Sequence, residues 1–182
     1  LNIVRIGTSG SVQADIPVDS FVISEKSIGC DGVLRFYANN ESVCDHPFEE
    51  AFIRHCRWTP SAARPYVVNA DPGLADRLYD EEHTIKGVTL TAVGFYGPQG
   101  RVLRLPLAMP GINDRITAFR YEGYKVTNYE MESAAITGLC NLLGHRAATI
   151  CLIIANRING DASADYHSYM NKLIRYTLEK LS

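Results

Sequence analysis

The chain has 182 residues, of which 46% are hydrophobic and 21% charged, with a formal net charge of −2. This length fits one domain over residues 1–182, which can bury about 70% of the surface of the unfolded chain. The charge argues against nucleic acid as the main partner, because phosphate-backbone binding needs a clustered positive excess. No apolar run approaches the roughly 18 residues of a membrane span, and no signal-peptide pattern is present, so we expect no membrane partner.

The cysteines and histidines exclude two further classes of protein. The five cysteines are odd in number and widely spaced, with no C-x-x-C pair. This usage is typical of a reducing compartment, and we expect a cytoplasmic protein rather than a disulfide scaffold. The five histidines are scattered without metal-ligand spacing, so no metal site is expected.

The chain opens on an apolar, β-branched run that predicts a buried strand over residues 1–6. The Gly-Thr-Ser-Gly sequence at 7–10 predicts a tight loop after it. Since the chain lacks an initiator methionine and starts inside this strand, we expect it to be the C-terminal part of a longer protein, with further strands before Leu1.

Strands and helices are then predicted in alternation. Strands are expected at 20–28, 87–96, 124–130 and 147–155, and helices at 47–58, 72–82, 112–120, 130–143 and 164–181, with loops near 39–46 and 104–114. At least two of the strands are apolar throughout, which is typical of a sheet covered by helices. The pattern therefore predicts an α/β protein.

Four polar segments fall where predicted strands end. They are RIGTSG (5–10), FYGPQGR (95–101), NYEMES (128–133) and IANR (154–157). Each has a simpler explanation when taken alone: a turn, core packing, a solvated arginine, or acidic charge at a helix N-terminus. In open α/β sheets, however, ligands bind outside the carboxyl ends of the strands, so the four segments together predict a ligand site.

These four segments, in this order and spacing, resemble the nucleoside phosphorylase family, specifically its uridine phosphorylase branch. The resemblance covers essentially the whole chain, including DGVLRFYA at 31–38. It implies a three-layer α/β/α fold with a central mixed sheet. It also implies phosphorolysis, in which uridine and phosphate give uracil and ribose 1-phosphate, with phosphate as co-substrate and no metal or organic cofactor.

The resemblance assigns the phosphate to Arg5 and Thr8. A guanidinium offers a fixed fork of donors to a phosphate, and the threonine hydroxyl adds another. Backbone N–H groups of the 7–10 loop are expected to help. The family has a glycine-bearing phosphate loop and further phosphate arginines, one from a neighbouring subunit. None of these has a counterpart here, so we expect them before Leu1 and in a partner copy of a homo-oligomer, a dimer or a hexamer built from dimers.

Three residues are expected at the ribose. An ionised carboxylate accepts from the two adjacent ribose hydroxyls, and Glu132 matches the family's residue for this role. Met131 matches the residue that packs on the sugar. Glu130 lies two residues before Glu132, which is about 200° around a helix, so it receives a secondary role in site shape or ribose contact.

The base is expected to meet four residues. The Gln99 amide can accept from uracil N3–H and donate to O2, while Arg101 donates to O4 and Phe95 stacks on the base or sugar. Arg157 supports Arg101 or reaches O4 through water. Because negative charge flows into the base as the glycosidic bond breaks, these donors favour the transition state. The family's purine enzymes have an aspartate where this chain has Asn156, which favours pyrimidines.

Two other functions stay open on the sequence. A nucleosidase of the same superfamily would use water in place of phosphate, and a non-catalytic module would bind a nucleoside without cleaving it. Uridine is not distinguished from thymidine or deoxyuridine. For phosphorolysis, Arg5, Thr8, Arg101 and Glu132 are the residues expected to carry catalysis.

Overall fold

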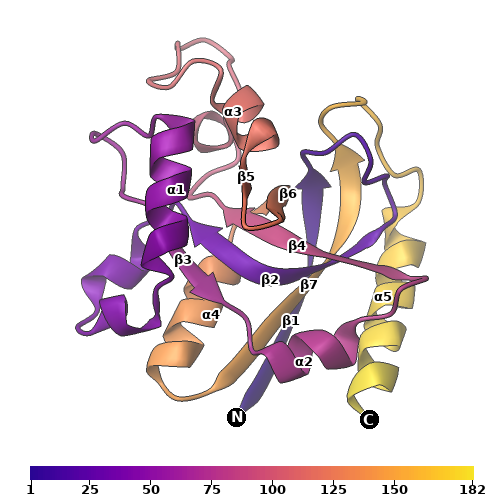
Figure 1. Ribbon diagram of the computed structural model, residues 1–182. Helices are drawn as coiled ribbons and strands as arrows, with labels where there is room; N and C mark the ends of the chain where they lie inside the picture. Colours follow the sequence, from indigo (N-terminus) through magenta and orange to yellow (C-terminus); the bar gives the residue numbers. More distant parts are fainter.

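The computed structural model describes all 182 residues and contains a seven-stranded sheet and five helices (Figure 1). The strands are β1 (Asn2–Ser11), β2 (Phe21–Gly29), β3 (Tyr66–Asn69), β4 (Thr84–Thr91), β5 (Arg120–Tyr121), β6 (Tyr124–Glu130) and β7 (Arg146–Asn156). The helices are α1 (His46–Cys56), α2 (Pro72–Leu78), α3 (Ile112–Ala118), α4 (Ser133–Leu142) and α5 (Tyr166–Leu181). Three short 3-10 turns, η1 (Val33–Phe36), η2 (Asn40–Val43) and η3 (Gly97–Gln99), lie in the connections.

The sheet is mixed, and its strand order is β1-β7-β2-β4-β6-β5, with β3 beside β2. Strand β1 runs parallel to β7 along its whole length. Its last two residues also pair antiparallel with β6, Gly10 with Tyr129 and Ser11 with Asn128. This contact brings the ends of β1 and β6 together, although β7, β2 and β4 lie between them in the strand order.

A buried hydrogen-bond network holds three strand ends in place. The Asn128 amide on β6 donates to the Ser9 hydroxyl on β1 at 2.9 Å and accepts from the Thr89 hydroxyl on β4 at 2.9 Å. All three side chains are buried. Because buried polar groups must be paired, this network favours one register of the three strands.

Helices cover the sheet from both sides. Ile150 and Leu152 on β7 alternate toward a core shared with α2 and α5, which includes Leu74, Leu78 and Leu173. A larger core forms under α1 and α3. Helix α4 packs across β7, β2 and β4. The arrangement confirms the predicted α/β class and the three-layer α/β/α fold with a mixed sheet.

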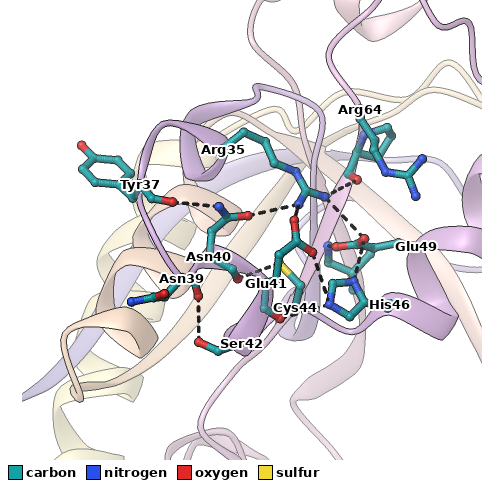
Figure 2. A network of polar contacts seen from close by, with 12 residues as sticks. Arg35, Tyr37, Asn39, Asn40, Glu41, Ser42, Cys44, His46, Glu49 and Arg64 are labelled. Atoms are coloured by element: carbon teal, nitrogen blue, oxygen red, sulfur yellow. Dashed lines mark hydrogen bonds and ion pairs between the residues drawn. The ribbon is translucent and has the colours of Figure 1, made fainter.

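A polar network fixes the turn-rich segment before α1 (Figure 2). The Arg35 guanidinium donates to Asn40 at 3.1 Å and pairs with Glu41 and Glu49. Glu49 is 1% exposed and also accepts from the backbone N–H of Val67 on β3, at 3.1 Å. The network therefore ties η1, η2 and α1 to the edge of the sheet.

Several element predictions need correction. Residues 7–10 are not a loop, since β1 continues to Ser11 with an irregularity between Ser9 and Gly10. Strand β4 covers Thr84–Thr91 rather than 87–96, because its pairing with β2 and β6 ends at Thr91. Helix α2 ends at Leu78, and α4 starts only at Ser133. The short strands β3 and β5 were not predicted.

Candidate active site

The predicted site residues converge on one cavity of about 260 Å³. It lies where β1, β6 and β7 end and where the segment after β4 turns back. All of the residues predicted for phosphate, ribose and base line it: Arg5, Thr8, Phe95, Gln99, Arg101, Glu130, Met131, Glu132 and Arg157. The structure thus brings together four segments that are far apart in the sequence, while the role of each residue stays a prediction.

At the β1 end of the cavity, the Arg5 guanidinium folds back over its own strand. A Cβ atom added at Gly7 would lie only 2.7 Å from Arg5 Nη1, so the missing side chain at Gly7 makes room for the guanidinium. Nη1 donates to the Cys151 sulfur at 3.4 Å. Thr8 is exposed, with its hydroxyl available at the same end.

Burial and charge act in opposite directions on Arg5. Burial alone would lower the pKa of its guanidinium, but the neighbouring Cys151, Glu130 and Glu132 outweigh burial and raise the pKa on balance. Burial raises the pKa of the Cys151 thiol to about 12, so this thiol is neutral at pH 7. Arg5 is therefore a cation at pH 7, and it lines the cavity.

The Glu130 carboxylate is hydrogen-bonded to neighbouring groups of the protein through both of its oxygens. One carboxylate oxygen accepts from the backbone N–H groups of Glu132 and Ser133, both at 2.8 Å. The other accepts from the hydroxyls of Thr91, at 2.5 Å, and Ser133, at 2.8 Å. The side chain is 1% exposed and lies 3.2 Å from Arg5. These contacts use the acceptor sites of the carboxylate, which favours the predicted role in site shape over ribose contact.

Glu132 differs from Glu130 in exposure and in its hydrogen bonds. It occupies the position before the first residue of α4, with φ −140°, and its side chain is 55% exposed. Its carboxylate pairs with Nη2 of Arg5 and makes no other side-chain hydrogen bond. The predicted angle of about 200° between Glu130 and Glu132 does not apply, because neither residue is inside the helix. Both carboxylates meet the same arginine.

At the opposite end of the cavity, Gln99 is buried and held by Arg157. The Arg157 guanidinium donates to the Gln99 backbone carbonyl at 3.1 Å and to its side-chain Oε1. Oε1 retains a second lone pair, and the NH₂ group stays free to donate. The amide therefore has one acceptor site and its donors left for a planar ligand.

Two other side chains form one wall of this end. The Arg101 guanidinium lies 4.2 Å from the centre of the Phe95 ring, and its Nε donates to the Phe95 carbonyl at 3.1 Å. Both residues remain partly exposed, and Phe95 is 52% exposed. A flat ring entering the cavity would meet an aromatic face beside a charged donor.

The Arg157 guanidinium has two further neighbours, the positive charge of Arg101 and the aromatic ring of Tyr129. Its guanidinium lies 4.5 Å from the centre of the buried Tyr129 ring. Burial, followed by repulsion from Arg101, lowers the pKa of Arg157 to about 10, so it remains charged at pH 7. No direct hydrogen bond joins Arg157 to Arg101. The two cations repel each other, so the structure gives no direct support of Arg101 by Arg157, and the direct partner of Arg157 is Gln99.

Some lining residues were not singled out from the sequence. Ser9, Gly10, Tyr129, Ile154 and Ala155 also line the cavity. All five lie within the four polar segments, so extending the prediction from single residues to whole segments would have found them. Asn113, which lies outside the segments, bonds to the Gln99 carbonyl, and no sequence pattern pointed to it.

A larger hollow of about 750 Å³ lies on the other side of Arg101, under the 103–109 segment. Its lining is mainly apolar, and the converging polar groups are in the smaller cavity. Nowhere in the structure do three His, Cys, Asp or Glu side chains gather as a metal site would require. None of the five helices is both long and apolar enough to span a membrane.

Comparisons with known proteins agree with this geometry. The model of the phosphorylase superfamily matches residues 1–177. The chain is 26% identical over 164 residues to a uridine phosphorylase of Thermococcus kodakarensis, covering 87% of this chain and 50% of the relative. It is 36% identical over 160 residues to uridine phosphorylase A of Schistosoma mansoni, covering 87% of this chain and 49% of the relative.

Among solved structures, a Trypanosoma brucei nucleoside phosphorylase superposes with a TM-score of 0.85 and 24% identity, over 99% of this chain and 63% of that one. The chain spans about half the length of the curated relatives it matches. The fold and the family that the sequence suggested are both confirmed. With its sheet, its cavity and a family match over residues 1–177, the chain belongs to the phosphorylase superfamily.

Proposed function

We propose that this chain carries the active site of an enzyme that cleaves uridine by phosphorolysis, giving uracil and ribose 1-phosphate. The observation that carries the proposal is the single cavity in which a cationic end, an acidic middle and an amide-lined end follow one another. These are the three chemistries that a phosphate, a ribose diol and a uracil ring require.

In this arrangement Arg5 and Thr8 hold the phosphate, whose oxygen attacks C1′ of the ribose. The Glu132 carboxylate accepts from the ribose hydroxyls, and Met131, which is 39% exposed, packs on the sugar. As the N1–C1′ bond breaks, its electron pair moves into the base. The proton of the attacking hydrogen phosphate then moves to the uracil anion, so uracil is released as a neutral molecule.

The base end supplies the largest electrostatic contribution. Gln99 and Arg101 aim donors at the uracil oxygens, where negative charge increases as the bond breaks. Since both donors are already fixed by Arg157 and Phe95, little reorganisation is needed in the transition state. The uridine phosphorylase names of two relatives support the same substrate.

The proposal also covers the co-substrate, the oligomeric state and the cellular compartment. Phosphate serves as co-substrate, without a metal or organic cofactor, and the working protein is a homo-oligomer. A partner copy would supply further cations beside Arg5. All five cysteines are free thiols, which supports a reducing compartment such as the cytoplasm.

Absorbance-monitored base release from a nucleoside panel, with and without phosphate, tests the proposal. We expect phosphate-dependent release from uridine and far slower release from cytidine, whose N3 carries no hydrogen for Gln99. A site built around such a hydrogen bond discriminates by about 10⁴-fold or more. Base release at the same rate with and without phosphate would indicate a nucleosidase. Uridine binding without release would indicate a non-catalytic module, and equal rates on cytidine or inosine would contradict the base assignment.

A further inference from the structure

We infer that Asn113 on α3 is a positioning residue that sets where Gln99 meets the base, together with the hydroxyl of Tyr129. This inference rests on the proposed function, because it assigns to Asn113 the specificity of the same site. Asn113 does not line the cavity, and it would act only through Gln99.

The contacts of Asn113 reach both sides of the base-binding turn. Its Nδ2 donates to the backbone carbonyls of Gln99, at 3.2 Å, and Gly100, at 3.4 Å. Its Oδ1 accepts from the hydroxyl of Tyr129 on β6, at 3.2 Å. One side-chain amide thus links the turn to a core strand.

The turn is shaped around this amide. Gly100 has φ +70°, a left-handed conformation that suits glycine. A Cβ at this position would lie 2.5 Å from Asn113 Nδ2, so the turn packs directly on the asparagine. The turn η3 is only three residues long and has no side-chain cap of its own. Its position therefore depends on groups that come from other elements.

Gln99 is clamped from two directions. Arg157 bonds to its backbone carbonyl and its Oε1, while Asn113 bonds to the same backbone carbonyl from α3. Arg157 in turn rests on the Tyr129 ring, whose hydroxyl binds Asn113. Tyr129 is 2% exposed, so Arg157 and Asn113 both contact one side chain that is packed in the core.

The orientation of the Asn113 amide is fixed by its partners. Tyr129 needs an acceptor and the two carbonyls need a donor, so only one orientation of the amide satisfies all three. An aspartate has the same shape but would turn a carboxylate oxygen toward two carbonyl oxygens. The turn would move away, and Gln99 would no longer meet the base with its acceptor and donors in place.

The test compares Asn113→Asp and Tyr129→Phe with a matched control. Tyr129→Phe keeps the ring under Arg157 and removes only the hydroxyl. Asn141→Asp is the control, since Asn141 on α4 also donates to a backbone carbonyl, that of Asn69 at 3.0 Å, away from the cavity. Initial rates are measured against uridine and against phosphate for the full chain. Hydrogen exchange of the backbone amides of Gly97 and of residues 99–101 is measured without substrate.

We expect Asn113→Asp to raise the KM for uridine by about tenfold or more, the change that 1.4 kcal/mol produces, with the KM for phosphate nearly unchanged. Tyr129→Phe should act in the same direction and less strongly. Both should accelerate exchange at Gly97 and residues 99–101, and the Asn141 control should change neither. Equal rises in both KM values, or unchanged exchange, would overturn the inference. If even the unchanged protein failed to cleave uridine, the proposed function would fall, while the exchange measurement would still decide the positioning role.

Discussion

Arg5 and Glu132 form an ion pair at the mouth of the cavity, although one is assigned to the phosphate and the other to the ribose. The Glu132 side chain is 55% exposed and that of Arg5 is 14% exposed, so the carboxylate is the partner with more room to move away. A phosphate bound to Arg5 would compete with Glu132 for the same nitrogen. In the proposed enzyme the pair would couple the two subsites, because an anion bound to Arg5 would free the carboxylate predicted to accept from the ribose hydroxyls.

The first prediction concerns Glu132→Gln. The amide keeps the shape but accepts more weakly from the ribose hydroxyls, so uridine turnover should fall by at least about tenfold, or 1.4 kcal/mol of transition-state stabilisation. Steady-state base release measures this change. Because the side chain is exposed, urea unfolding should give nearly the same stability as for the unchanged protein. Near-normal turnover would mean that Glu132 only favours the helix N-terminus.

The second prediction is that Glu130→Gln, unlike Glu132→Gln, lowers the stability of the protein. An NH₂ group would replace one of the two oxygens that accept from backbone N–H groups and hydroxyls. Leaving buried donors unpaired costs about 1–3 kcal/mol, so the free energy of unfolding should fall by at least that much. Urea denaturation of this variant beside Glu132→Gln separates the two glutamates. Equal stabilities would contradict the assignment of Glu130 to the framework.

The gathering of the candidate residues in one cavity could be predicted because they cluster in short segments at strand ends. The end of a strand is a local sequence feature, and the α/β topology carries such ends to one edge of the sheet. The residues that support the site were not predictable in this way. Asn113 contacts Gln99, fourteen residues earlier, from α3, and it has no periodicity or motif of its own.

The bounds predicted for single elements were wrong where contacts outside the local sequence decide the structure. Gly, Thr and Ser at 7–10 are typical of a turn, yet pairing with β7 and β6 keeps these residues in a strand. The helix after Glu130 starts late because the Glu130 side chain accepts the N–H groups of Glu132 and Ser133. Neither the strand pairing of residues 7–10 nor the hydrogen bonds of Glu130 can be read from the order of the amino acids. The hydrogen bonds of Glu130 place both glutamates outside the helix.

The third prediction concerns His46 at the start of α1, in the network of Figure 2. Its Nδ1 lies 3.2 Å from the Glu49 carboxylate and its Nε2 lies 3.1 Å from the Glu41 carbonyl. Only the imidazolium donates from both nitrogens. The hydrogen bond to Glu49, supported by the charges of Glu49 and Glu41, raises the pKa of His46 above its ordinary value despite some burial.

A raised pKa in the folded state gives a stabilisation that is complete below the unfolded pKa of about 6.5 and is lost as the pH rises through the folded pKa. Urea unfolding across this range should therefore show stability falling with rising pH, and His46→Gln should remove that component. His167→Gln is the control, because the His167 ring packs on Tyr166 rather than on a carboxylate. A pH profile unchanged by His46→Gln would contradict the assignment.

The fourth prediction concerns Gly7→Ala, which tests the phosphate end without touching a charged group. The new Cβ would lie 2.7–2.8 Å from the Arg5 guanidinium, the far end of a flexible side chain, so Arg5 should move. Folding should not suffer, since glycine inside a strand is itself about 0.5–1 kcal/mol less favourable than alanine.

Displacing Arg5 should raise the KM for phosphate several-fold. The KM for uridine should change less, because Gln99, Arg101 and Arg157 lie at the other end of the cavity and the effect on uridine is limited to the contact of Arg5 with the ribose end. Initial rates over a phosphate series at saturating uridine measure this difference. Gly73→Ala in α2 is the matched control, since its Cβ would meet only the side chain of Asp71 and lies outside the cavity. An unchanged KM for phosphate in Gly7→Ala would show that the guanidinium position in β1 does not determine anion binding, and the phosphate assignment of Arg5 would have to be abandoned.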